Sequence, residues 1–144
     1  MIDRLRTRGQ ASGQCDLSAE IPALAKLLSL HWGIAVRHVE PGDAIIVSTL
    51  LLHEVQQLLR EAIANAARHG DARAVEIEMA VRSDNLILVI CDDGMGFPDH
   101  AGSITPRSLS GRVSALGGEL SLASQRGYSR IEIVLPIPSA SHGA

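Results

Sequence analysis

The most constraining feature of this sequence is the run Leu86–Cys91, in which every residue is apolar. A strand that is apolar on both faces has to be covered on both, so the run predicts an interior strand. Before it, Val75–Arg82 alternates apolar with charged residues, which is typical of a strand with one face in water. The turn-forming residues Ser83–Asn85 join the two segments, so the sequence predicts a pair of consecutive strands here.

Helical spacing predicts two long helices ahead of these strands. In the first, Ser18 is a candidate N-cap and Gly33 a candidate stop, and Ile34–Glu40 follows as a predicted strand. The second runs from about Val47 to His69, with Gly70 where a residue that ends a helix belongs. The apolar stripes are Ile21, Leu24, Ala25 and Leu28 in the first helix, and Leu52, Val55, Leu59, Ala62 and Ala66 in the second.

The remaining pattern completes an α+β fold. A short helix around Ser108–Leu116 ends at a double glycine, and two alternating strands, 119–124 and 130–135, follow it. No regular βαβ repeat is present, so we expect a two-layer sandwich whose mixed, mostly antiparallel sheet has its helices on one face. Residues 17–138 are expected to form this domain, 1–16 a flexible leader or linker remnant, and 139–144 a flexible tail.

Composition excludes several functional classes. The 144 residues suit one domain. With Trp32, Phe97 and Tyr128 as its only aromatic residues, the chain lacks a platform for stacked bases. Its 13 basic and 16 acidic residues give no basic field for nucleic acid.

Cys15 and Cys91 are interpreted as reduced thiols. No apolar run approaches the ~18 residues of a membrane span, so we expect a cytoplasmic segment without direct membrane contact.

The second long helix carries a polar row of Glu61, Asn65 and His69, each four residues from the next. At about 100° per residue these side chains share one edge of the apolar stripe. Together they could present a base, a metal-coordinating oxygen and a phosphate-facing donor to one ligand. The alternative is a solvated helix flank.

A second candidate site is Asp92-Asp93-Gly94-Met95-Gly96-Phe97, directly after the most apolar strand. Glycines let the backbone approach a ligand closely, and a carboxylate can accept a hydrogen bond from an exocyclic amine. The alternative is a tight turn that leaves a buried strand. The helix at 108–116 could offer an N-terminus to an anion, although alone it is ordinary packing.

In this order, the motifs resemble the ATP-binding catalytic domain of sensor histidine kinases, within the gyrase, chaperone, histidine kinase and mismatch-repair ATPases (GHKL, or Bergerat fold). Glu61–His69 is similar to the N box of that family, and Asp92–Phe97 to its first glycine box. Arg112–Leu120 and Arg130–Pro136 resemble the close of the domain in the nitrate-sensor-like subfamily. The resemblance covers roughly Leu17 to Pro138.

The resemblance implies that Asn65 binds a Mg²⁺ ion that bridges the phosphates of ATP, with His69 and Arg68 near those phosphates. Glu61 takes the catalytic place, where it either orients groups around Asn65 or assists proton removal. Mg²⁺ and positioning then supply most of the catalysis.

The resemblance also implies the adenine contacts. Asp92 accepts a hydrogen bond from the adenine amino group, while Gly94 and Gly96 let the loop pass close to the nucleotide. Asp93 stands where asparagine is common, and it is either a water-mediated contact to Mg-ATP or, as we favour, a solvated surface residue.

The chain departs from the family in the lid over the nucleotide. The usual Gly-x-Gly is replaced by Gly102-Ser103-Ile104-Thr105-Pro106. Thr105 could donate to a phosphate, as could Gly102 and Ser103, but Pro106 has no N–H and stiffens the loop. Full turnover of ATP therefore stays open at this point.

The implied function is transfer of the γ-phosphoryl group of ATP to a histidine on a separate dimerisation domain, and from there indirectly to a response regulator. The segment would then belong to the cytoplasmic part of a membrane-bound sensor. Two alternatives stay open: a stand-alone anti-sigma-type serine kinase, and a nucleotide-binding interaction module with little turnover. His53–Glu54 is interpreted as helix surface, and four other histidines lack ligand spacing: His31, His38, His100 and His142.

Overall fold

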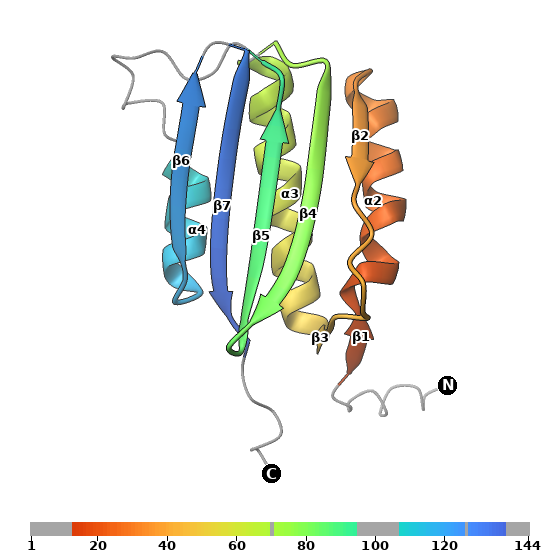
Figure 1. Ribbon diagram of the computed structural model, residues 1–144, viewed down its shortest axis with the longest axis vertical. Coiled ribbons are helices and arrows are strands. Elements are labelled where there is room, and N and C mark those ends of the chain that lie inside the picture. The colour runs from red at the N-terminus through yellow and green to blue at the C-terminus, as the bar shows by residue number, and fades with distance from the viewer. Residues whose placement is uncertain (1–12, 70, 95–106, 126, 138–144) are drawn as a thin grey trace.

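The computed structural model describes residues 13–69, 71–94, 107–125 and 127–137, and its main feature is a five-stranded sheet (Figure 1). The strand order is β2-β4-β5-β7-β6. β2 and β4 are parallel, and the other neighbours are antiparallel, which confirms the expected mixed sheet. The strands are β2 (Ala35–His38), β4 (Ala74–Arg82), β5 (Asn85–Asp92), β6 (Glu119–Gln125) and β7 (Tyr128–Pro136).

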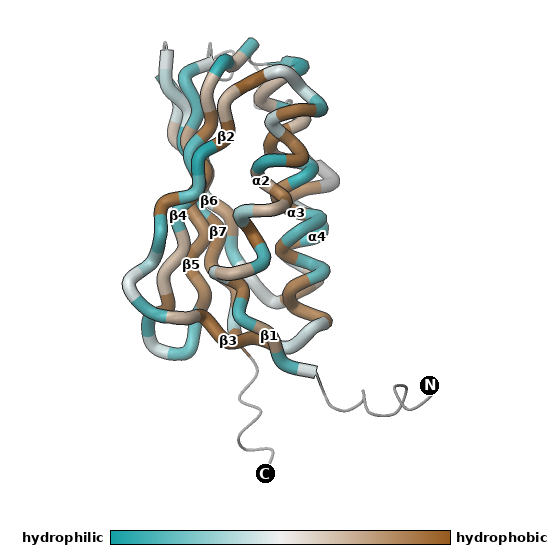
Figure 2. The backbone as a smooth tube through the Cα atoms, turned by 90° about the vertical axis from the view of Figure 1, so that its right-hand side faces the viewer, coloured by the Kyte–Doolittle hydropathy of each residue, from teal (hydrophilic) through white to brown (hydrophobic). Residues whose placement is uncertain are grey.

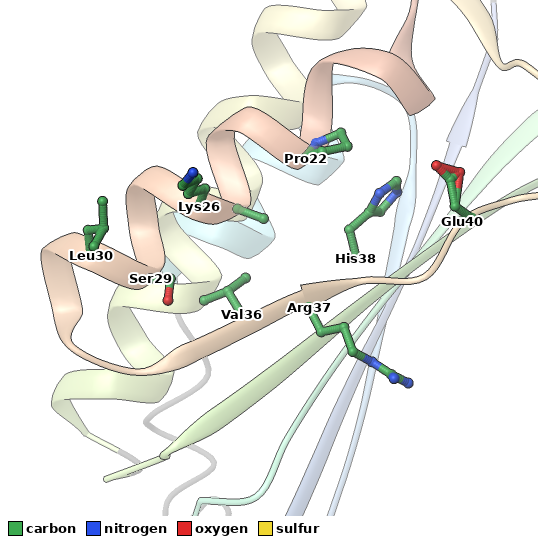
Figure 3. A pocket seen from close by; sticks show the side chains of 9 residues that line it. Pro22, Lys26, Ser29, Leu30, Val36, Arg37, His38 and Glu40 are labelled. Atoms are coloured by element: carbon green, nitrogen blue, oxygen red, sulfur yellow. The ribbon is translucent and has the colours of Figure 1, made fainter.

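Helices α2 (Leu17–Trp32), α3 (Thr49–Arg68) and α4 (Arg107–Ala115) cover one face of this sheet (Figure 2). The core lies between the two layers, so the predicted α+β sandwich is confirmed. No helix within the described ranges is long and apolar enough to cross a membrane. The fully buried side chains include Ile21, Leu58, Leu59 and Ile63 from the helices and Ile77, Leu88, Ile90 and Ile133 from the strands.

β5 is interior, as its continuous apolar run predicts. It pairs with β4 through Val75↔Asp92 and with β7 through Leu86↔Leu135. Even Val89, on the face of the sheet away from the helices, is only 8% exposed. The register carries Asp92 to the end of the sheet where β4 begins.

The opposite end of the domain corrects two expectations. Gln14–Asp16, expected within the flexible leader, forms strand β1, which pairs antiparallel with β3 (Ile46–Ser48). Such three-residue strands are too short to show an alternating pattern. Asp16, and not Ser18, caps α2: its Oδ1 accepts from the Ser18 N–H at 3.0 Å and from the Ile45 N–H at 3.0 Å. Gly33 ends α2 in the left-handed conformation at φ 68°, as predicted.

The double glycine after α4 is a close-packed junction. Gly117 has φ 78°, a value that favours glycine. A Cβ atom on Gly118 would collide with the carbonyl oxygen of Val134 and lie 2.8 Å from Cδ2 of Leu135. The helix therefore ends where the sequence predicts, and β6 can pack directly against β7.

Candidate functional site

The polar row of α3 lies along the last two turns of that helix. Glu61 and Asn65 are half-buried, whereas Arg68 and His69 are exposed. The carbonyl oxygen of Asn65 accepts from the His69 N–H at 2.9 Å, which closes the last turn. The side chains of this row therefore become more exposed to solvent toward the carboxyl end of the helix.

Asn65 carries the least satisfied group of this row. Its Nδ2 atom is buried and makes no hydrogen bond within the described part of the chain. A buried donor without an acceptor costs roughly 1–3 kcal/mol, so natural proteins seldom leave one without a purpose. The amide therefore has the capacity to bind a polar group that the described residues do not supply.

Asp92, the last residue of β5, is the second half-buried polar group at this end. Its Oδ1 accepts from the Gly94 N–H at 2.8 Å, and Gly94 is itself buried. Burial raises the pKa of the Asp92 carboxyl above its ordinary value, and the charge of Asp93 acts in the same direction, against the hydrogen bond from Gly94. One carboxylate oxygen is thus oriented by its own loop, and the site favours a hydrogen-bond donor on the other.

Asp93 has a structural role that the sequence did not indicate. It is exposed, as the surface interpretation expects, but its Oδ1 accepts from the backbone N–H groups of Arg73 at 2.8 Å and Ala74 at 3.0 Å. These hydrogen bonds lower the pKa of the Asp93 carboxyl. No motif could have revealed the contact, because its donors are backbone groups twenty residues away.

The structure brings the two predicted boxes to one end of the domain. The carboxyl end of α3 and the end of β5 both lie at the top of Figure 1. The Ala72 N–H donates to the Ala66 carbonyl at 3.0 Å, and Arg73 then donates to Asp93. Predicted site residues Gly96 and Thr105, with the lid at 102–106, lie outside the described residues.

His53 and Glu54 lie near the other end of α3. His53 is exposed, as predicted for a helix surface. Glu54 Oε1 lies 4.0 Å from a guanidinium nitrogen of Arg112, which links α3 to α4. The ion pair between Glu54 and Arg112 therefore contributes to the packing of α3 against α4.

Sequence comparison decides the family. Residues 52–139 match the family described as histidine kinase-, DNA gyrase B-, and HSP90-like ATPase. The chain belongs to this ATPase family. The match contains both the Asn65 row and the Asp92 loop, so the resemblance seen in the motifs is confirmed.

Curated relatives of this ATPase domain are sensor kinases. The chain is 33% identical over 94 residues to the sensor histidine kinase LnrJ of Bacillus subtilis, covering 65% of this chain and 24% of that protein. It is 34% identical over 139 residues to the signal transduction histidine-protein kinase/phosphatase UhpB of Salmonella typhimurium, covering 94% of this chain and 27% of that protein. The chain thus spans about a quarter of the curated relatives it matches.

Solved structures agree on the ATPase fold. The ATP-binding domain of PrrB from Mycobacterium tuberculosis superposes with a TM-score of 0.73 at 25% identity, covering 88% of this chain and 97% of that one. The histidine kinase domain of a blue-light activated kinase from Erythrobacter litoralis gives a TM-score of 0.74 at 22% identity, covering 94% of this chain and 69% of that one. The described fold is therefore that of histidine kinase ATP-binding domains.

Proposed function

We propose that this domain binds Mg-ATP and transfers the γ-phosphoryl group to a histidine on a separate dimerisation domain. The observation that carries the proposal is that two polar groups lie on elements that end at the same end of the domain (Figure 1): the oriented carboxylate of Asp92, and the amide of Asn65, whose buried Nδ2 has no partner among the described residues. The curated relatives bear the names of sensor histidine kinases, which favours histidine as the acceptor.

Asp92 would read the adenine ring. The Gly94 N–H holds Oδ1, and the adenine amino group would donate to the same carboxylate. Because the carboxylate is half-buried, water competes poorly for this contact, and a hydrogen bond there is worth more than on the surface. The adenine amino group would in turn offset part of the cost of burying the carboxylate.

Asn65 would hold the triphosphate end. Its buried Nδ2 supplies a donor that a phosphate oxygen can satisfy, and its amide oxygen is a ligand type that suits Mg²⁺. Mg²⁺, when bound, would neutralise charge on the transferring phosphoryl group. Arg68 and His69, exposed one turn further along, would face the phosphates, and Glu61 would orient groups around Asn65 or assist proton removal.

We further propose that the phosphoryl group passes from the acceptor histidine to a response regulator, and that this segment works in the cytoplasm. Both follow from the relatives being sensor kinases, of which a domain of this kind forms one part.

Calorimetric titration with ATP, with and without Mg²⁺, tests the nucleotide step. We expect the wild type to bind ATP less tightly when Mg²⁺ is removed. We also expect Asn65→Ala to bind Mg-ATP less tightly than the wild type does. Exposed Asp43, on a turn outside the site, provides the control Asp43→Asn, which should bind like the wild type. An absence of binding heat by the wild type would overturn the proposal.

Transfer is tested with labelled ATP and a histidine-containing dimerisation domain. Label that is lost in acid identifies phosphohistidine and supports the proposal. Acid-stable label would indicate the serine kinase alternative instead, and binding without any label would indicate an interaction module.

A further inference from the structure

The segment between α3 and β4 connects the two halves of the site. It leaves the helix with the Ala72 N–H donating to the Ala66 carbonyl at 3.0 Å. It then joins the sheet edge, where the Ala35 N–H of β2 donates to the Arg73 carbonyl at 2.9 Å. Asp71 within it adopts a left-handed conformation at φ 55°, which few residues other than glycine tolerate. The path of the chain from Asp71 to Arg73 is therefore tightly specified.

The end of β5 depends on that segment for its position. After the pair Val75↔Asp92, the next backbone bond, from the Asp93 N–H to the Ala74 carbonyl, is 3.3 Å long. The Asp93 side chain adds two shorter bonds, from Arg73 at 2.8 Å and Ala74 at 3.0 Å. Among the described residues, two of the three hydrogen bonds that join Asp93 to the segment Arg73–Ala74 therefore come from the Asp93 carboxylate.

We propose that Asp93 is a positioning residue for nucleotide recognition, which fixes the Asp92 carboxylate relative to the Asn65 end of α3. The inference rests on the proposed function, since it assigns Asp92 to the adenine. Asp93 itself would not contact the nucleotide. Its carboxylate holds the loop that carries Asp92 and Gly94 against the backbone N–H groups of Arg73 and Ala74.

If the Asp92 carboxylate is less firmly positioned, the domain should bind adenine less selectively while it still folds. Inosine triphosphate, which carries a carbonyl oxygen where adenine carries the amino group, is the matched probe. The wild type should bind ATP more tightly than inosine triphosphate, in both cases with Mg²⁺. In Asp93→Ala we expect this preference to fall by about tenfold, because small displacements of a positioned group are costly. Binding of inosine triphosphate should change little.

The conservative variant separates positioning from charge. In Asp93→Asn the amide oxygen can accept the same two N–H bonds, so the preference for ATP should stay within about threefold of the wild type. Asp93→Ser, whose hydroxyl reaches less far, should fall between the two and serves the same test if Asp93→Ala does not fold. Asp43→Ala, which removes another exposed aspartate from a turn outside the site, is the control for charge.

The outcomes distinguish this inference from the proposed function. If the wild type shows no preference for ATP over inosine triphosphate, the assignment of Asp92 to adenine fails. If the wild type shows it and both Asp93→Ala and Asp93→Ser keep it, the positioning role of Asp93 is wrong. A general loss of stability would weaken the binding of both nucleotides equally and leave their ratio unchanged, which would also count against it.

Discussion

The two ends of the domain treat polar groups in opposite ways. At the closed end, formed by β1, β3, the start of α2 and Gly117–Gly118, the Asp16 carboxylate accepts from Ser18 and Ile45, and the side chains of Leu17 and Val47 are buried. At the proposed nucleotide end, formed by residues 65–69, 72–74 and 92–94, Asn65 has a buried donor with no partner in the described part of the chain, and Asp92 is half-buried with a raised pKa.

This contrast teaches where stability and binding are located. Hydrogen-bonded groups beside an apolar core stabilise the fold, so changes at the closed end should act on stability. Unpaired or desolvated groups cost free energy until a ligand satisfies them, so changes at the nucleotide end should act on binding. Four substitutions test this division between stability and binding.

The largest expected effect on stability is that of Leu17→Ala at the closed end. Leu17 is fully buried, so the truncation should lower the free energy of unfolding by about 3 kcal/mol through lost burial and a cavity. Denaturant unfolding measures the loss. ATP affinity of the folded fraction should be unchanged, and a selective loss of affinity would contradict the division between the two ends.

At the nucleotide end, Asp92→Asn should weaken ATP binding by about 10- to 100-fold, or roughly 1.5–3 kcal/mol, because a charged hydrogen-bond acceptor is lost. Its effect on stability should be small or favourable. The pKa of Asp92 is raised in the native state, so the ionised carboxylate costs stability at neutral pH, and the amide removes that cost. Calorimetry and thermal unfolding check the two halves, and a large fall in Tm would contradict the expectation.

Gly118→Ala should destabilise the closed end by about 2 kcal/mol, because the added methyl group forces β6 away from the Val134 carbonyl. Gly111→Ala offers a matched control in α4, since nothing lies within 4 Å of the Cβ atom it would add. Thermal unfolding of both variants measures the difference. Equal melting temperatures would show that the junction yields without cost.

The smallest expected effect is that of Asp16→Asn, and it should depend on pH. The hydrogen bonds to Asp16 lower its pKa, so its contribution to stability is fully present above the ordinary value, about pH 4, and is lost as the pH falls below it. The variant should therefore be less stable than the wild type at neutral pH, and the gap should close in acid. A gap that is constant from pH 7 to pH 2 would show that the charge of Asp16 plays no part.

Much of the fold could be predicted from the sequence because its strands bury one face or both. The alternation in β4 and the continuous apolar run of β5 specify their places, and Gly33 and the double glycine mark the ends of helices. β1 and β3 could not be found, since three residues show no period. The sequence predicts Ser18 as the N-cap of α2 in place of Asp16, because serine and aspartate both cap helices and these two residues lie two positions apart.

The candidate site divides in a similar way. Asn65 and Asp92 belong to motifs with recognisable spacing, and the structure places both toward the same end of the domain. Their roles, like those of Glu61, Arg68 and His69, stay predictions. The link from Asp93 to Arg73 and Ala74 could not be predicted, because a backbone N–H is common to nearly all residue types and leaves no mark on a sequence.

The place of β7 has a consequence for how the domain is made in the cell. β7 is the last strand of the described chain, yet it lies between β5 and β6 in the sheet. During synthesis, the long apolar strand β5 therefore has one unpaired edge until residue 136 has left the ribosome. A growing chain of this kind is prone to aggregation until β7 pairs with β5. A chain that ended ten residues before residue 136 would lack β7, and β5 would keep an unpaired edge.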